Sequence, residues 1–161
     1  MYRYPFTPYP NGWFRIALSE DVARGDVLPL RYFGKDLVLF RGEDNKARVL
    51  DAHCPHLGAH MGYGGQVKGN DIACPFHDWS FNGEGDCVEI PYCEKIPKKA
   101  KIKPWHVLEK NGLIFVHYHA ENKAPSFELP TVAEVDNPKW SRFVKLNWKI
   151  KVHIQEVAEN A

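Results

Sequence analysis

Two short segments, each pairing a cysteine with a histidine, constrain this chain more than any other feature. Cys54-Pro55-His56 is followed by 17 residues and then by Cys74-Pro75-Phe76-His77. Close spacing lets each loop direct both of its side chains toward one point, and the flanking Pro and Gly residues favour loops. Between the pairs, Lys68-Gly69-Asn70-Asp71 predicts a turn that folds the segment back as a hairpin. The sequence therefore predicts one shared metal site, with the ligands Cys54, His56, Cys74 and His77.

Two kinds of metal site use two thiolates and two imidazoles. Zinc binds such a set tetrahedrally, but its common fingers keep both Cys in one knuckle and both His on one helix. Here each loop mixes Cys with His, and no helical pattern follows Cys74. A [2Fe–2S] cluster of Rieske type places two Cys on one iron and two His on the other. One such cluster per chain is favoured, and a zinc site is the alternative.

Residues 54–81, CPHLGAHMGYGGQVKGNDIACPFHDWSF, and the following GEGDCVEIPY resemble the Rieske domain of Rieske non-haem iron oxygenases. They are most similar to the ketosteroid hydroxylase and cholesterol desaturase branch, and the resemblance extends over about residues 10–118. It implies that Cys54 and Cys74 bind one iron, and that His56 and His77 bind the outer iron. It also implies a mainly β fold, an antiparallel sandwich or barrel with two cluster-binding hairpin loops at one tip.

The residues themselves independently predict β structure. Residues 12–17, 26–33, 36–41 and 47–52 are short, rich in β-formers and separated by turn signals. Asn111-Gly112 predicts a hairpin between strands at 102–109 and 113–118. Ser19 is expected to cap a one-turn helix over 19–23. We therefore predict a Rieske [2Fe–2S] domain over residues 1–118.

The C-terminal part has a different pattern. Three prolines punctuate residues 119–140, which predicts an extended linker. Residues 141–154 alternate apolar and polar side chains as a half-buried strand does, and a helix is expected to start near the end. Glu159-Asn160-Ala161 resembles the opening of the oxygenase catalytic motif, so residues 141–161 are expected to be the truncated start of that domain. The alternative is a natural small Rieske protein.

The resemblance implies a role in electron transfer. Single electrons would pass from a flavin reductase or a ferredoxin to a mononuclear non-haem Fe(II), present only in a full-length parent. That parent would use O₂ to hydroxylate or desaturate a hydrophobic, steroid-like substrate, and the family often forms trimers. Because the chain lacks the catalytic iron site, it is an oxidoreductase component with no assigned catalytic residue. A stand-alone ferredoxin-type carrier and a zinc-stabilised β interaction module are the alternatives.

Charge and hydropathy exclude other partners. The 21 Lys and Arg residues balance 20 Asp and Glu residues, which removes the electrostatic case for nucleic acid or an anionic membrane. The longest apolar runs are too short to span a bilayer. The N-terminal residues have no signal-peptide core, so a cytoplasmic protein is expected.

Several other polar residues have weaker interpretations. His53 and His60 are expected to be structural, because the four-ligand set is complete without them. Cys87 and Cys93 are expected to be free thiols. His106, His117 and His119 are expected to be ordinary surface or half-buried histidines. A basic run is expected to form a solvated edge strand, with a docking face for an acidic electron donor as the alternative; it contains Lys95, Lys98, Lys99, Lys101 and Lys103.

The resemblance also bears on the redox potential. High-potential Rieske proteins carry a disulfide between the cluster loops and donate hydrogen bonds to sulfur from Ser and Tyr. The corresponding residues here, Ala59, Phe76, Trp79 and Phe81, lack those groups. Because such donors stabilise the reduced cluster, their absence predicts a potential at the low end of the Rieske range, which begins at about −150 mV.

Overall fold

The computed structural model describes residues 9–135, 137–141, 144, 146 and 148–159, and its fold is mainly antiparallel β, as predicted. One sheet has the order β1 (Gly12–Leu18), β10 (Leu113–Tyr118), β9 (Val107–Lys110). A second sheet has the order β2 (Val27–Tyr32), β3 (Lys35–Arg41), β4 (Ala47–Asp51). The third consists of β5 (Gln66–Lys68), β6 (Asp71–Ala73), β7 (Ser80–Phe81) and β8 (Cys87–Glu89). A 3-10 helix η1 (Ser19–Asp21) and helix α1 (Ile154–Glu159) complete the elements.

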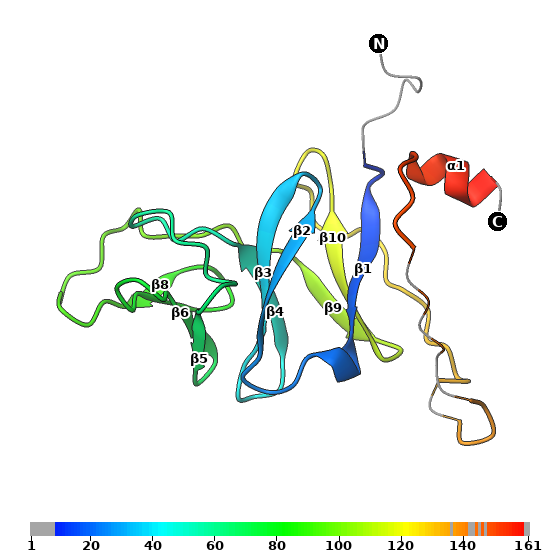
Figure 1. Ribbon diagram of the computed structural model, residues 1–161, viewed down its shortest axis with the longest axis horizontal. Coiled ribbons are helices and arrows are strands. Elements are labelled where there is room, and N and C mark those ends of the chain that lie inside the picture. The colour runs from blue at the N-terminus through cyan, green and yellow to red at the C-terminus, as the bar shows by residue number, and fades with distance from the viewer. Residues whose placement is uncertain (1–8, 136, 142–143, 145, 147, 160–161) are drawn as a thin grey trace, which may run out of the picture.

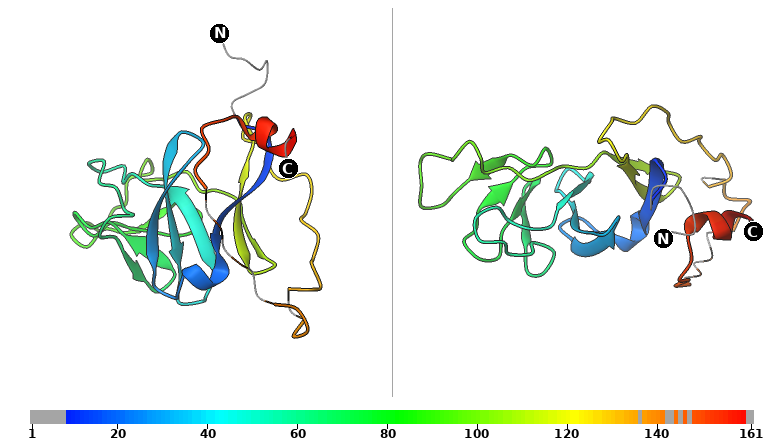
Figure 2. Two further views of the ribbon diagram at one scale, coloured as in Figure 1. Left: turned by 45° about the vertical axis from the view of Figure 1, so that its right-hand side comes forward. Right: turned by 90° about the horizontal axis from the view of Figure 1, so that it is seen from above.

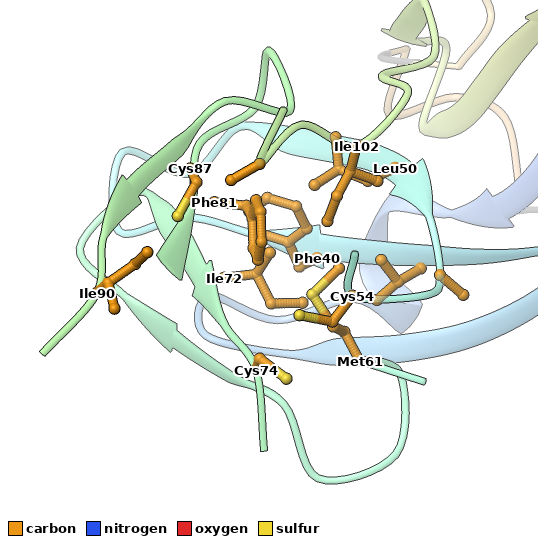
Figure 3. Packing of buried hydrophobic residues seen from close by; sticks show 13 residues of the cluster. Phe40, Leu50, Cys54, Met61, Ile72, Cys74, Phe81, Cys87, Ile90 and Ile102 are labelled. Carbon is orange, nitrogen blue, oxygen red and sulfur yellow. The ribbon is translucent and has the colours of Figure 1, made fainter. Parts of the chain in front are cut away.

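The β5–β8 sheet lies at one end of the molecule, and the described residues after β10, ending in α1, lie at the other (Figure 1, Figure 2). Strand β3 is buried on both faces, as its continuous apolar run indicates, and it therefore contributes side chains to two cores. Leu37 and Leu39 pack in a core with β1 and β10. Val38 and Phe40 face the opposite way, into a second core beneath the β5–β8 sheet (Figure 3). One strand therefore gives the small sheet a rigid support.

Arg41 closes β3 with a buried network of hydrogen bonds. Its guanidinium binds both carboxylate oxygens of Glu109 on β9, at 2.8 and 2.9 Å. The same side chain donates to the carbonyls of Val22 and Asn45, at 2.7 and 2.8 Å. Since Arg41 is 4% exposed, this network satisfies a charge that would otherwise be costly to bury.

Two short elements differ from the sequence prediction. The helix predicted over 19–23 with Ser19 as its cap is the shorter η1, and its N-cap is Leu18, which is still extended. The cap lies one residue earlier because β1 runs directly into the turn, where the Ser19 N–H donates to the Gly112 carbonyl. The strand expected from 102 begins at Val107, since Pro104 has no N–H to donate to a ladder. The Asn111-Gly112 turn is confirmed, with both residues at positive φ.

The basic run is a loop and not an edge strand. Its five lysines are exposed, and the backbone there makes isolated bonds, such as that from Ile102 N–H to the Gly85 carbonyl at 2.8 Å. The described residues within 141–154 contain no strand, so that expectation is wrong for them, whereas the expected helix near the end is observed as α1. Within the described residues, no helix is long and apolar enough to cross a bilayer.

Candidate metal centre

Two loops with the same backbone hydrogen bonds carry the four predicted ligands. In the first cluster loop, Cys54–Ala59, the Cys54 N–H donates to the Ala59 carbonyl at 2.9 Å. In the second cluster loop, Cys74–Trp79, the Cys74 N–H donates to the Trp79 carbonyl, also at 2.9 Å. The second loop connects β6 to β7, and the β5–β6 hairpin between the loops turns at residues 69–70, as predicted. The hairpin thus folds the second loop back toward the first.

The fifth residue of each cluster loop has a left-handed backbone. Gly58 has φ 75° and donates its N–H to the Cys54 carbonyl at 2.9 Å. Asp78 has φ 62° and donates to the Cys74 carbonyl at 3.0 Å. The Asp78 carboxylate forms an ion pair with Lys68 of β5. A short polar side chain is among the few that tolerate this conformation, which explains an aspartate there.

The two cysteines lie at one edge of the second core, beside Met61 (Figure 3). Cys54 is 2% exposed and Cys74 is 3% exposed. Burial raises the pKa of the Cys54 thiol to about 11; the His56 N–H opposes that rise, and the neighbouring Cys74 thiol adds to it. Two adjacent buried thiols become thiolates readily when a bound metal supplies positive charge.

The two histidines lie farther out than the thiols. His77 is exposed and His56 is half-buried, and their ring centroids are 4.7 Å apart. The ring of His56 stacks on Trp79 at 4.5 Å with an interplanar angle of 5°. Trp79 in turn donates its indole N–H to the hydroxyl of Tyr92 at 2.6 Å. This stack fixes the plane of the His56 ring.

This donor set fits a [2Fe–2S] cluster. A buried thiol pair with an outer imidazole pair matches a cluster whose irons differ in protein ligands, two thiolates on one and two imidazoles on the other. Among the described residues, no three His, Cys, Asp or Glu side chains form a group that could hold one metal ion. A Rieske cluster does not need such a group, because each iron takes two protein ligands.

The segment between the loops packs tightly, as its glycines suggested. A Cβ on Gly62 would lie 2.7 Å from the Cα of Pro29, and one on Gly65 would lie 2.2 Å from the Met61 carbonyl oxygen. His60 accepts a hydrogen bond from the Gly62 N–H at 3.1 Å, and its ring packs edge-on against His53 at 5.1 Å. Both histidines therefore have the structural role that was expected.

Sequence reasoning missed two contacts of the site, those of Trp79 with Tyr92 and of Asp78 with Lys68. Both join residues ten or more positions apart, Trp79 with Tyr92 of another loop and Asp78 with Lys68 of β5, and no spacing rule connects such pairs. The other cysteines are free thiols, as predicted: Cys87 is buried in the same core as Cys54, and Cys93 is exposed.

Comparison with known proteins agrees with this architecture. Cholesterol 7-desaturase nvd 1 of Ciona intestinalis is 42% identical over 152 residues, which are 94% of this chain and 32% of that protein. A probable 3-ketosteroid-9-alpha-monooxygenase, oxygenase component, of Rhodococcus rhodochrous is 40% identical over 94% of this chain and 39% of its own length. The chain thus spans about a third of the length of these curated relatives.

Structural comparison gives the same family. The crystal structure of dicamba monooxygenase bound to dicamba matches 80% of this chain and 38% of that chain, with a TM-score of 0.72 and 26% identity. The sequence pattern of the Rieske [2Fe-2S] domain matches residues 12–105, more than half of the chain. Together with the two equivalent Cys/His loops, these matches establish that the chain belongs to the Rieske [2Fe–2S] domain family of desaturases and monooxygenases.

Proposed function

We propose that this chain binds one [2Fe–2S] cluster, with Cys54 and Cys74 on the inner iron and His56 and His77 on the outer iron, and transfers single electrons. The main support for this proposal is the pair of matched loops, which hold two buried thiols beneath two outer imidazoles. When bound, the cluster supplies a one-electron redox couple.

The protein's own residues would set the direction of electron exit. The apolar core beside the thiols, including Ile72 and Phe81, keeps water from the inner ligands. His77 lies at the surface, so an imidazole rather than a thiolate would face a redox partner. An imidazole that binds iron through one nitrogen keeps the other nitrogen for a hydrogen bond or a proton. The groups around that second nitrogen therefore influence the orientation of the ring.

We further propose that the chain is the electron-donating part of an oxygenase-type protein. A flavin reductase or a ferredoxin would reduce it, and a mononuclear Fe(II) in a full-length parent would receive the electron. The relatives named cholesterol 7-desaturase and ketosteroid monooxygenase, at 42% and 40% identity, favour a hydrophobic, steroid-like substrate for that parent. No disulfide joins the four cysteines, all of which lie among the described residues, and reduced cysteines fit a cytoplasmic protein.

Metal analysis and spectroscopy test the cluster directly. The purified chain should contain two irons and two acid-labile sulfides, and the dithionite-reduced protein should give a Rieske-type EPR spectrum. Cys54→Ser should abolish both, whereas Cys93→Ser, at an exposed thiol, should leave both unchanged. His77→Cys should move the potential toward about −400 mV, the range of all-thiolate clusters. A colourless protein with one zinc ion and no sulfide would contradict the proposal.

A further inference from the structure

A second polar site lies outside the proposed cluster ligands. A pocket of about 410 Å³ opens between the β2–β3 turn, the segment before β9, the end of β10 and the loop that follows. Its lining carries three lysines, three histidines and no acidic residue; the lysines are Lys35, Lys103 and Lys123, and the histidines are His106, His117 and His119. The three lysines give this pocket a positive charge that no acidic residue of the lining offsets.

The lysines are only partly compensated by acids. Lys123 forms an ion pair with Glu121, just outside the lining. Lys103 lies 4.8 Å over the Trp105 ring and donates to the amide oxygen of Asn122. Lys35 has no acidic partner among the described residues. Lys35 and Lys103 therefore have no anionic partner among the residues that the structure describes.

His117 is the buried member of the lining. It is 6% exposed, its ring packs edge-on against Trp13 at 5.2 Å, and the rings of His106 and His119 are each 6.4 Å away. Within the described part of the chain, the His117 ring makes no hydrogen bond. Burial lowers the pKa of His117, and the positive charges that His106 and His119 can carry lower it further. A hydrogen-bond acceptor bound in the pocket would stabilise the protonated form of this ring.

The chemistry of the lining selects an anion over a metal ion. Zinc would need ring nitrogens within about 2.1 Å of one point. No three of the described His, Cys, Asp or Glu side chains are so arranged, and the lysines would repel a cation. The lining contains no arginine, so lysine ammonium groups would hold the anion, and lysine binds phosphate as a point charge.

We infer that this pocket binds a tetrahedral oxyanion of the phosphate class, either inorganic phosphate or the phosphoryl group of a larger molecule. Lys35 and Lys103 supply the charge, and a ring N–H of His117 donates a hydrogen bond. The pocket shares none of the four proposed cluster ligands, so the inference is independent of the electron-transfer proposal.

Calorimetric titration of the cluster-loaded chain at constant ionic strength tests the inference. Inorganic phosphate and ribose 5-phosphate are the two probes, and tighter binding of one identifies the source of the oxyanion. Lys35→Gln combined with Lys103→Gln should weaken binding at least tenfold. A matched double variant, Lys95→Gln with Lys98→Gln, removes the same charge from the exposed loop and should change affinity less than twofold.

A pH series with sulfate, whose own charge is constant between pH 6 and 8, isolates the histidines. Affinity should rise as the pH falls, because a protonated His117 adds positive charge beside Lys35, Lys103 and Lys123. The other groups that face it are His106, His119 and Tyr118; Glu121, paired with Lys123, and Asp51, which accepts from the Trp105 indole, are the nearby acids. Equal losses in both double variants, binding of chloride as tight as that of phosphate, or an affinity for sulfate that is flat with pH would overturn the inference.

Discussion

Asp78 occupies in the second cluster loop the left-handed position that Gly58 occupies in the first, and each donates its N–H to the carbonyl of the cysteine that opens its loop. The two loops are therefore one backbone design used twice, with the imidazole placed two residues after Cys54 and three after Cys74. The substitution of aspartate for glycine puts a carboxylate next to His77, and Lys68 lies against it.

That carboxylate should lower the redox potential, and Lys68 should offset part of the effect. Asp78→Asn keeps a residue that tolerates positive φ but removes the charge, so the potential should rise by about 20 mV, the Coulomb effect of one charge roughly 8 Å away in water. Lys68→Gln should lower the potential by a similar or smaller amount. EPR-monitored redox titration measures both. Shifts of the same sign in the two variants would show that charge is not the cause.

The stack of Trp79 on His56 should protect the cluster from loss. Trp79→Ala exposes the outer face of the His56 ring and should speed bleaching of the visible absorption under a chelator roughly 2- to 10-fold, the equivalent of one aromatic pair. Trp79→Phe keeps a ring and should bleach at close to the wild-type rate. Tyr92→Phe removes the acceptor of the indole N–H and should give an intermediate rate. Equal rates for Ala and Phe at position 79 would exclude a role for the stack.

The sequence was sufficient for the parts of the fold that depend on local chemistry. Alternating and continuous apolar runs located β1 to β4, and Asn111-Gly112 located the β9–β10 turn, because pleat and turn geometry restrict residue types directly. The matched Cys/His spacing located both cluster loops. Composition alone could not separate strand from loop at 95–103, because lysines suit either when the partner of a segment is unknown.

The contacts around the site were beyond sequence reasoning for a different reason. Tyr92 meets Trp79 because the loop after β8 folds back toward the second cluster loop, and no spacing rule predicts that approach. His117 meets His106 across the β9–β10 hairpin, and His119 follows it two residues later, but their proximity to Lys35 depends on tertiary structure. His106, His117 and His119, which the sequence predicted to be ordinary histidines, line the pocket that also contains three lysines.

The Arg41–Glu109 pair should make stability depend on pH. Burial opposes the charged carboxylate, but the hydrogen bonds from Arg41 lower the pKa of Glu109 below its ordinary value of 4.5. A lowered folded-state pKa means that the stabilisation is fully present above about pH 5 and is lost as the pH falls through the folded-state value. Glu109→Gln should cost about 1–3 kcal/mol at pH 7, since the buried Arg41 loses a charged acceptor.

Urea unfolding followed by tryptophan fluorescence, at pH 7 and at pH 3.5, measures this effect. The difference in the free energy of unfolding between wild type and Glu109→Gln should be smaller at pH 3.5 than at pH 7. Glu94→Gln removes a carboxylate from an exposed loop and should change stability by less than about 0.5 kcal/mol at either pH. A gap that is constant with pH would mean that the pair acts through packing and not through charge.

Gly85 should be required for the packing of the β7–β8 turn. Its φ is 79°, and a Cβ there would lie 1.9 Å from the Ile102 carbonyl oxygen and 2.9 Å from the Ile102 carbonyl carbon. Gly69, in the β5–β6 turn, has a φ of 60° with no atom within 4 Å of the corresponding Cβ. The two glycines therefore separate backbone strain from steric collision.

Alanine at each position should give different losses of unfolding free energy. Gly69→Ala should cost about 1–2 kcal/mol, the penalty of a left-handed backbone for a residue with a Cβ. Gly85→Ala should cost a further 1–3 kcal/mol or so, because the backbone at Ile102 must move away and that residue packs in the core beside Phe81. The same urea titration measures both variants. Equal losses of unfolding free energy in the two variants would mean that the backbone at 100–104 moves aside at no cost. If Gly85→Ala costs more, its visible cluster absorption should also bleach faster under a chelator, because the displaced core supports the two thiols.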